Sequence, residues 1–99
     1  MPLWKTASRS DLRRLEAIGI LLKKCPWWIS QIFHPTDPCL QASPQALMRG
    51  ASTGERVLIG LAFDFWSPGL VGIQVASLNC LDDENFQNVL TAIALLRTL

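Results

Sequence analysis

Residues 52–66 read STGERVLIGLAFDFW, and this stretch decides the fold. Ser52 is followed three residues later by Glu55. This spacing matches the capping box, in which the serine hydroxyl and the glutamate carboxylate each satisfy a backbone donor at the start of a helix. The sequence therefore predicts a helix over 53–66. Its apolar residues surround the axis almost completely, and such a helix is central and buried in a domain.

A narrow stripe of Arg56, Gly60 and Asp64 interrupts the apolar surface of this helix. Gly60 has no side chain, so we expect another backbone to come close there. We expect Asp64 to contact either water or a cation from a basic helix, because an isolated buried charge is costly. A catalytic role for Asp64 is disfavoured, since no second carboxylate or histidine lies near it in the sequence.

Start signals predict further short helices on both sides of the central one. Ser8 caps an amphipathic helix over 8–24, and Pro26 suits the first position of a short apolar helix. Ser43 and Asp82 each cap another helix. The expected inner face of the first helix consists of Leu12, Leu15, Ile18, Gly19 and Leu22. The expected inner face of the last helix consists of Phe86, Val89, Leu90, Ile93 and Leu96.

Two segments carry weaker signals. Residues 34–43 are polar and contain two prolines, which predicts a loop. Residues 70–78 fit a strand by the alternation of Val71, Ile73 and Val75, and they also fit a helix by recurrence every three to four residues. We favour a short helix, because a lone strand would leave its hydrogen-bonding groups unpaired. A short strand near 70–76 is the alternative.

The chain has 99 residues, of which 49% are hydrophobic and 17% are charged. This length provides one domain and excludes large architectures such as barrels and doubly wound sheets. The sequence therefore predicts an all-α fold, a compact single domain over 1–99 with four to six short helices around the buried helix 53–66. Average soluble domains have about 25% charged residues, so part of this surface must be uncharged. Burial of most of 57–81 would account for much of the shortage.

Charge is distributed unevenly along the chain. Residues 1–49 contain seven basic and three acidic side chains, a net charge of +4, and residues 50–99 contain two basic and five acidic ones, a net charge of −3. These opposite charges predict attraction between the two halves of one core, or between two copies arranged head to tail. The total of +1 is too small to steer the protein toward nucleic acid or anionic lipid.

The three cysteines predict neither disulfides nor a metal site. They are odd in number and lack C-x-x-C spacing, so we expect free, buried thiols and a reducing compartment, which indicates the cytoplasm. Zinc ligands usually lie in closely spaced pairs, and the only candidate group is too loose to meet that pattern. This group consists of Cys25, His34, Asp37 and Cys39.

Residues 57–81 are long enough to cross a bilayer, but we expect no membrane span. Ser67-Pro68-Gly69 interrupts the stretch near its middle, and Asp64 would be costly in hydrocarbon. The N-terminal region does not fit a secretory signal either, because the apolar run over 18–22 is short and is followed by two lysines.

No catalytic motif is present in the sequence. It has no glycine-rich phosphate loop and no nucleophile motif, and its one histidine, His34, is expected at the surface in a loop. We therefore predict a protein that is not an enzyme and needs no cofactor. It would be a small adaptor, inhibitor or subunit that docks an uncharged surface on a protein partner or on a second copy of itself.

Tryptophan identifies one candidate docking surface. Adjacent Trp27 and Trp28 cannot point the same way, so we expect one in the core and the other at or near the surface. Tryptophan is enriched at interface hot spots, and the outer face of the last helix has amides in place of charges. The predicted partner-binding residues are Trp27, Trp28, Gln87, Asn88, Thr91 and Leu95.

A DNA-binding regulator is the alternative function. Residues 75–93 resemble a helix-turn-helix module, which implies core positions at Leu78, Leu81, Phe86, Val89 or Leu90, and Ile93. The implied recognition helix begins Asp82-Asp83-Glu84, which phosphate would repel. Nucleic acid is therefore the less favoured partner.

Overall fold

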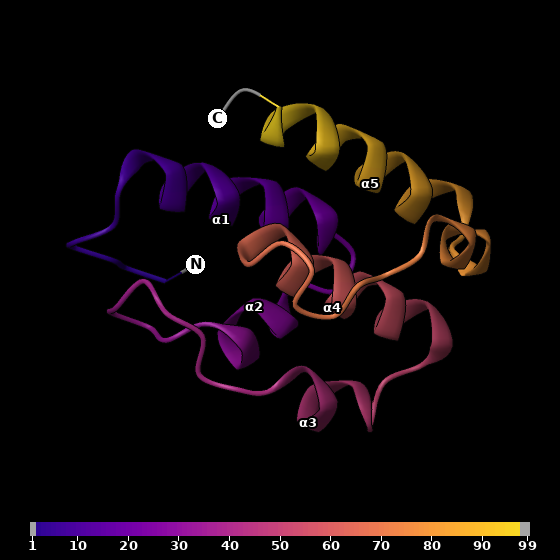
Figure 1. Cartoon of the computed structure of the whole chain (residues 1–99), viewed down its shortest axis with the longest axis horizontal. Coiled ribbons are helices and arrows are strands. Elements are labelled where there is room, and N and C mark those ends of the chain that lie inside the picture. Colours follow the sequence, from indigo (N-terminus) through magenta and orange to yellow (C-terminus); the bar gives the residue numbers. More distant parts are fainter. Residues whose placement is uncertain (1, 98–99) are drawn as a thin grey trace.

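Four helices begin at the side chain that the sequence assigns as their cap. The computed structural model describes residues 2–97. Within them the elements are α1 (Arg9–Leu21), α2 (Trp27–Ile32), α3 (Pro44–Met48), α4 (Thr53–Trp66), the 3-10 helix η1 (Val75–Cys80) and α5 (Asp83–Leu96) (Figure 1). Ser8, Ser43, Ser52 and Asp82 each accept a hydrogen bond from the backbone N–H three residues later. The all-α prediction is confirmed, since the only β-pairing in this part of the chain is an isolated bridge between Phe33 and Leu40.

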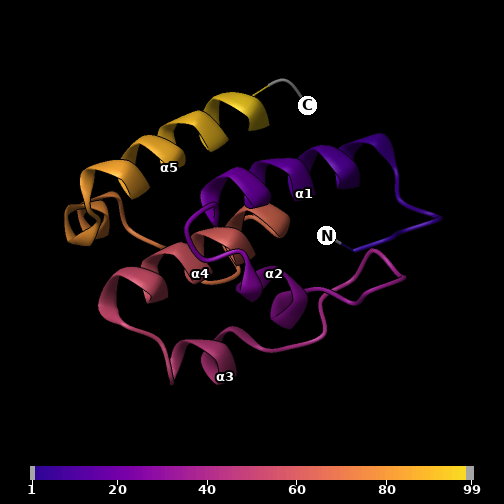
Figure 2. The same ribbon diagram turned by 180° about the vertical axis from the view of Figure 1, so that it is seen from behind.

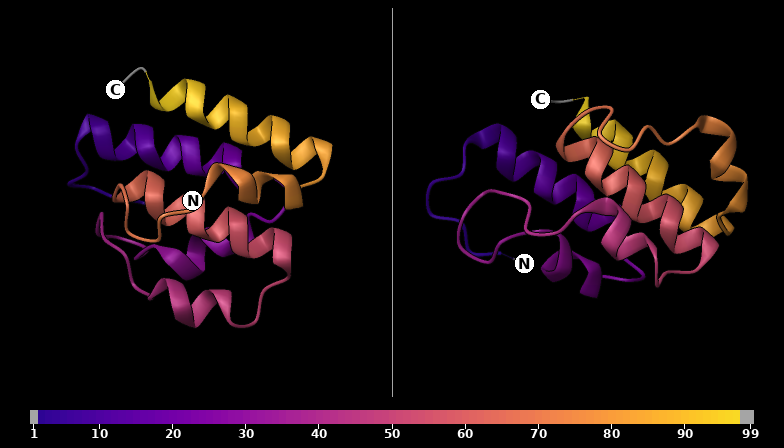
Figure 3. Two further views of the ribbon diagram at one scale, coloured as in Figure 1. Left: turned by 45° about the vertical axis from the view of Figure 1, so that its right-hand side comes forward. Right: turned by 60° about the horizontal axis from the view of Figure 1, so that its bottom comes forward.

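Helix α1 packs against both α4 and α5, and the smaller elements complete the core. Helix α5 lies along α1 and runs in the opposite direction (Figure 1). Helix α3 and η1 pack against α4, and α2 lies on the side of the molecule away from α5 (Figures 1 and 3). Helix α4 has more buried residues than any other described helix, as predicted for the central one. They are Val57, Leu58, Ile59, Gly60, Ala62 and Phe63.

A lysine joins the basic and acidic halves of the chain. The Lys24 ammonium lies 2.8 Å from the Asp82 carboxylate and 3.6 Å from the Glu84 carboxylate, at the start of α5. The hydrogen bond between Lys24 and Asp82 raises the pKa of Lys24 and lowers the pKa of Asp82. The remaining ion pairs within residues 2–97 join neighbours three positions apart, so the attraction between the halves acts here.

The predicted inner faces of α1 and α5 are wrong at three positions. Leu12, Leu90 and Ile93 were expected in the core, but all three are exposed, the last two to 44% and 40%. The fully buried positions include Ala17 in α1 and Ala92 in α5, two small residues that let packed helices approach closely. The buried faces are shifted around each helix from the predicted ones, and they keep the predicted Leu15, Ile18 and Leu22 at α1 and Val89 in α5.

The expectation that most of 57–81 is buried is also wrong for its second half. None of residues 64–81 is fully buried, and Leu70 and Val75 are exposed to 47% and 84%. Residues 70–74 form neither helix nor strand, so the short helix is found only as the 3-10 helix over 75–80. Within residues 2–97, no helix is both long and apolar enough to cross a membrane.

Asp64 holds the 70–74 segment against α4. One carboxylate oxygen accepts hydrogen bonds from the Val71 and Gly72 N–H groups at 2.7 and 3.0 Å, and the other accepts from Gly72 and Ile73 at 3.0 and 2.8 Å. Partial burial raises the pKa of Asp64, but these backbone hydrogen bonds outweigh it and place the pKa below its ordinary value. The partners of Asp64 within the described chain are therefore backbone amides, whereas a cation from a basic helix was one expected alternative.

Gly60 makes room for the same segment. A Cβ atom at this position would lie 2.7 Å from Cγ1 of Ile73 and 3.3 Å from Cγ1 of Val71. A close approach at Gly60 was predicted, but the approaching groups are these side chains, whereas a backbone was expected. Gly72, with a φ of 78°, provides the left-handed turn that lets three consecutive N–H groups face one carboxylate.

Candidate protein-interaction surfaces

An apolar groove lies beside Trp27, at the start of α2. Its volume is about 750 Å³, which is within the usual range of ligand pockets. Trp27 is exposed to 58%, and its indole N–H has no hydrogen-bond partner within residues 2–97. The groove has no charged residue in its lining. The lining consists of Pro2, Leu3, Pro26, Trp27, Ile29, Ser30, Phe33, Pro35, Thr36 and Gln41.

The N-terminal segment forms one wall of this groove and is fixed to the 34–41 loop beside it (Figure 2). The Leu3 N–H donates to the Pro35 carbonyl at 2.8 Å, and the Trp4 indole N–H donates to the His34 carbonyl at 2.8 Å. The Trp4 ring contacts the rings of Phe33 and Trp66, with centroids 5.5 and 5.3 Å apart. These contacts preform the wall, because both the backbone and the first tryptophan are anchored.

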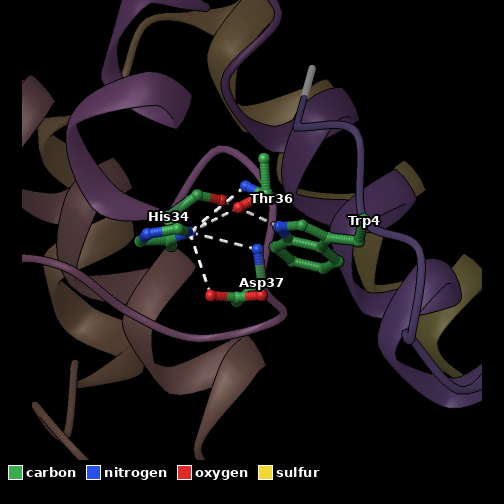
Figure 4. A network of polar contacts seen from close by, with 4 residues as sticks. All are labelled: Trp4, His34, Thr36 and Asp37. Carbon is green, nitrogen blue, oxygen red and sulfur yellow. Dashed lines mark hydrogen bonds and ion pairs between the residues drawn. The ribbon is translucent and has the colours of Figure 1, made fainter.

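The His34 side chain organises the start of the 34–41 loop (Figure 4). Its Nδ1 atom accepts hydrogen bonds from the backbone N–H groups of Thr36 and Asp37 at 3.2 and 3.1 Å. An imidazole nitrogen can accept these hydrogen bonds only when it carries no proton. The Asp37 carboxylate lies 3.6 Å from the same nitrogen. The predicted loop is confirmed, and His34 lies at the surface as expected, with its side chain exposed to 39%, where it organises a turn.

Gln41 connects this loop back to α2. Its backbone N–H donates to the Ile32 carbonyl at 2.9 Å, and its side-chain amide donates to the Ser30 carbonyl at 2.6 Å. The His34 N–H donates to the Cys39 carbonyl at 2.9 Å. The groove is therefore built from three separate parts of the chain, the N-terminal segment, α2 and the 34–41 loop, which are all hydrogen-bonded to their neighbours.

The two adjacent tryptophans point in different directions, as predicted. Trp28 is half-buried, and its indole N–H donates to the Glu55 carboxylate at 2.7 Å, which links α2 to the start of α4. This hydrogen bond, together with those from Ser52, lowers the pKa of Glu55. The polar group of Trp28 is thus engaged within the chain, whereas that of Trp27 has no hydrogen-bond partner among residues 2–97.

The predicted residues of α5 do not all face solvent. Gln87 and Thr91 are exposed, and the Thr91 hydroxyl donates to the Gln87 carbonyl at 3.0 Å. Asn88 and Leu95 are half-buried, and Leu95 packs against the core. The Asn88 side-chain nitrogen is enclosed and has no hydrogen-bond partner in the described part of the chain. The solvent face of α5 instead includes Leu90 and Ile93, so its middle is more apolar than expected.

The six predicted partner-binding residues therefore belong to two surfaces. Trp27 and Trp28 are in α2 and the other four are in α5, and α1 lies between these helices in the ribbon views (Figures 1 and 3). The groove could not be predicted from the sequence, because its walls come from segments some thirty residues apart, as the hydrogen bond between Trp4 and His34 shows.

The cysteines provide no recognisable reactive site. Cys25 is buried, and burial raises the pKa of its thiol, as does the nearby charge of Glu55. Cys39 and Cys80 are exposed, so the expectation of buried thiols is wrong for these two. Within residues 2–97, no three His, Cys, Asp or Glu side chains gather in a way that could hold a metal ion.

The helix-turn-helix resemblance can be compared with the elements over 53–96. Helix α4, η1 and α5 follow one another in the expected order, but the middle element is a 3-10 helix. The first turn of α5 carries Asp83 and Glu84.

Comparison of the chain with protein-family models, curated proteins and solved structures finds no match. The two surfaces, around Trp27 and along α5, are therefore the features of the molecule that bear on function.

Proposed function

We propose that this protein is a non-catalytic interaction module that binds an extended, uncharged segment of a protein partner in the groove beside Trp27. One observation carries the proposal: an exposed tryptophan, whose indole N–H has no hydrogen-bond partner within residues 2–97, borders a groove that has no charged lining residue. A small adaptor, inhibitor or subunit in a reducing compartment such as the cytoplasm fits this activity and the three unpaired thiols.

The lining supports an apolar segment as the occupant. Burying a charged side chain in such a groove would be costly, because no lining residue offers an opposite charge. Apolar side chains carry no such desolvation cost. Each Å² of apolar surface removed from water stabilises the complex by about 25 cal/mol. The preferred ligand is thus a short run of aliphatic, aromatic or proline residues.

The indole N–H of Trp27 supports an extended conformation of that segment. A partner helix uses its own backbone carbonyls for internal hydrogen bonds, whereas an extended or polyproline segment leaves them free. One such carbonyl can accept from Trp27 while the neighbouring side chains enter the groove. Aromatic-lined grooves recognise proline-rich segments in this way.

Selection from a random peptide library displayed on phage tests the proposal with the full chain as bait. We expect enriched peptides to be uncharged and apolar over four to six residues, and Trp27→Ala to weaken their binding by about 30-fold or more, as truncation of a hot-spot tryptophan does. Leu70→Ala is the matched control, because Leu70 is exposed to 47% and does not line the groove.

Two results would count against the proposal. Either no peptide is enriched, or the enriched peptides bind the Trp27→Ala variant as tightly as the wild type. Far-ultraviolet circular dichroism of both variants checks that the fold is intact, which is expected because both side chains are largely in solvent.

A further inference from the structure

The solvent face of α5 carries a stripe of residues spaced three and four apart. This α5 stripe consists of Asp83, Gln87, Leu90, Ala94 and Arg97. At about 100° per residue these positions share a narrow arc opposite the buried Val89 and Ala92. Leu90 is at the middle of the stripe and is exposed to 44%, and Ile93 flanks it. Such spacing is typical of a helix that packs along another helix.

The charges of the stripe lie only at its ends, and they are opposite. Asp83 is in the first turn of α5, Arg97 caps its C-terminal end, and the positions between them are uncharged. Neither residue forms an ion pair within the described chain, whereas the neighbouring Asp82 and Glu84 are paired with Lys24. Each is seven residues from Leu90, or about 10 Å along the helix axis.

We propose that the α5 stripe binds the α5 stripe of a second copy of this chain, with the two helices antiparallel and crossing at Leu90. This arrangement places Asp83 of each copy beside Arg97 of the other, so two ion pairs related by a two-fold axis flank an apolar centre. A parallel pair would put like charges side by side at both ends, which is unfavourable. The two-fold arrangement also closes, so it gives a dimer and not a filament.

The neighbouring residues are compatible with close packing of the two helices. Ala94 is small enough to let the partner helix approach, and Ile93 extends the apolar area beside Leu90. One pair of helices buries less area than a standard interface of about 1,600 Å², so the dimer is expected to be weak, with a dissociation constant in the micromolar range or above. The pairing uses a different surface from the Trp27 groove and does not depend on it.

Sedimentation equilibrium of the full chain over a range of concentrations tests the pairing. We expect reversible dimers, and we expect Leu90→Glu to weaken them at least tenfold, because a charge would be buried at the two-fold axis. Leu70→Glu is the matched control, since Leu70 has similar exposure and lies outside α5. A wild-type protein that stays monomeric up to millimolar concentration, or a Leu90→Glu variant that dimerises like the wild type, would overturn the proposal.

Charge reversal separates the antiparallel dimer from any other. Asp83→Arg and Arg97→Asp should each weaken dimerisation, because each creates like-charged contacts at both ends. An equimolar mixture of the two variants should recover dimerisation, since position 83 of each copy in the mixed dimer then faces the opposite charge at position 97 of the other. The double variant should also recover it by itself. If the double variant stays as weak as the single ones, the antiparallel arrangement is wrong.

Discussion

Replacing Asp64 with alanine should release the 70–74 segment from α4 and lower the free energy of unfolding by about 2–3 kcal/mol. Three backbone N–H groups lose their acceptor in this variant. The Gly72 N–H is exposed and can bind water, so we assign it no net loss. The Val71 and Ile73 N–H groups are partly buried, and their bonds of 2.7 and 2.8 Å to a charged oxygen are assigned about 1–1.5 kcal/mol each.

Urea denaturation followed by circular dichroism measures this loss, and a thermal scan should show a midpoint lower by about 10–20 °C, given about 4–8 °C per kcal/mol for a domain of this size. The Asp64→Asn variant should lose nearly as much free energy of unfolding, because the NH₂ group of the asparagine side chain would face a backbone N–H donor. A loss below about 0.5 kcal/mol in both variants would refute the reasoning, since it would mean that water satisfies these N–H groups equally well.

Gly60→Ala provides an internal control through a double-mutant cycle. By itself the new methyl group would overlap the Ile73 side chain, and this strain should outweigh the gain of about 1 kcal/mol that alanine brings to a helix interior. In the Asp64→Ala background the segment is free to move, so Gly60→Ala should become stabilising. Additive effects of the two substitutions would show that Asp64 and Gly60 do not act on the same segment.

The stabilisation by Asp64 should depend on pH in a defined direction. Its folded-state pKa is below the ordinary value of 3.8, so the unfolded state binds the proton more readily. The contribution is therefore fully present above about pH 5 and is lost as the pH falls through 3.8 and then through the folded-state pKa. The difference in stability between the wild type and Asp64→Ala should narrow over that interval.

Two further predictions concern the tryptophans and the thiols. Trp28→Phe removes the hydrogen bond to the carboxylate at the start of α4 and should cost about 1 kcal/mol in urea denaturation, whereas Trp27→Phe should change stability by less than about 0.5 kcal/mol. Iodoacetamide should modify Cys39 and Cys80 in the native protein and Cys25 only upon unfolding, as measured by mass spectrometry of the peptides; rapid native labelling of Cys25 would contradict its burial.

Helix starts could be predicted from sequence because their causes are local. Ser8, Ser52 and Asp82 each accept a hydrogen bond from an N–H group three residues later, so the donor and acceptor are close in the chain before any tertiary structure forms. Ser52 also shows the limit of this reasoning. The Glu55 carboxylate of the predicted capping box accepts hydrogen bonds from the Ser52 hydroxyl and from the indole N–H of Trp28, a residue 27 positions away.

The faces of the helices could not be predicted as well, because they depend on packing partners. Leu90 and Ala92 in α5 are both compatible with the core by residue type, and the larger one would be chosen from hydrophobicity alone. The structure buries Ala92 completely and leaves Leu90 exposed, because the face of α5 that packs on the core carries Val89, Ala92, Leu95 and Leu96. Sequence periodicity indicates that a helix is amphipathic. In a helix with apolar residues nearly all round, however, periodicity does not determine which face is buried in the core.

The shortage of charge must now be explained by the surface and not by the core. No charged residue occurs between Asp64 and Asp82, and burial was expected to account for this stretch. Most of residues 67–80 are exposed, including Leu70 and Val75. Uncharged surface is therefore spread over this segment, the groove beside Trp27 and the middle of α5. An exposed surface of this kind favours association over isolation in water, which supports the view that the protein acts by contact with other chains.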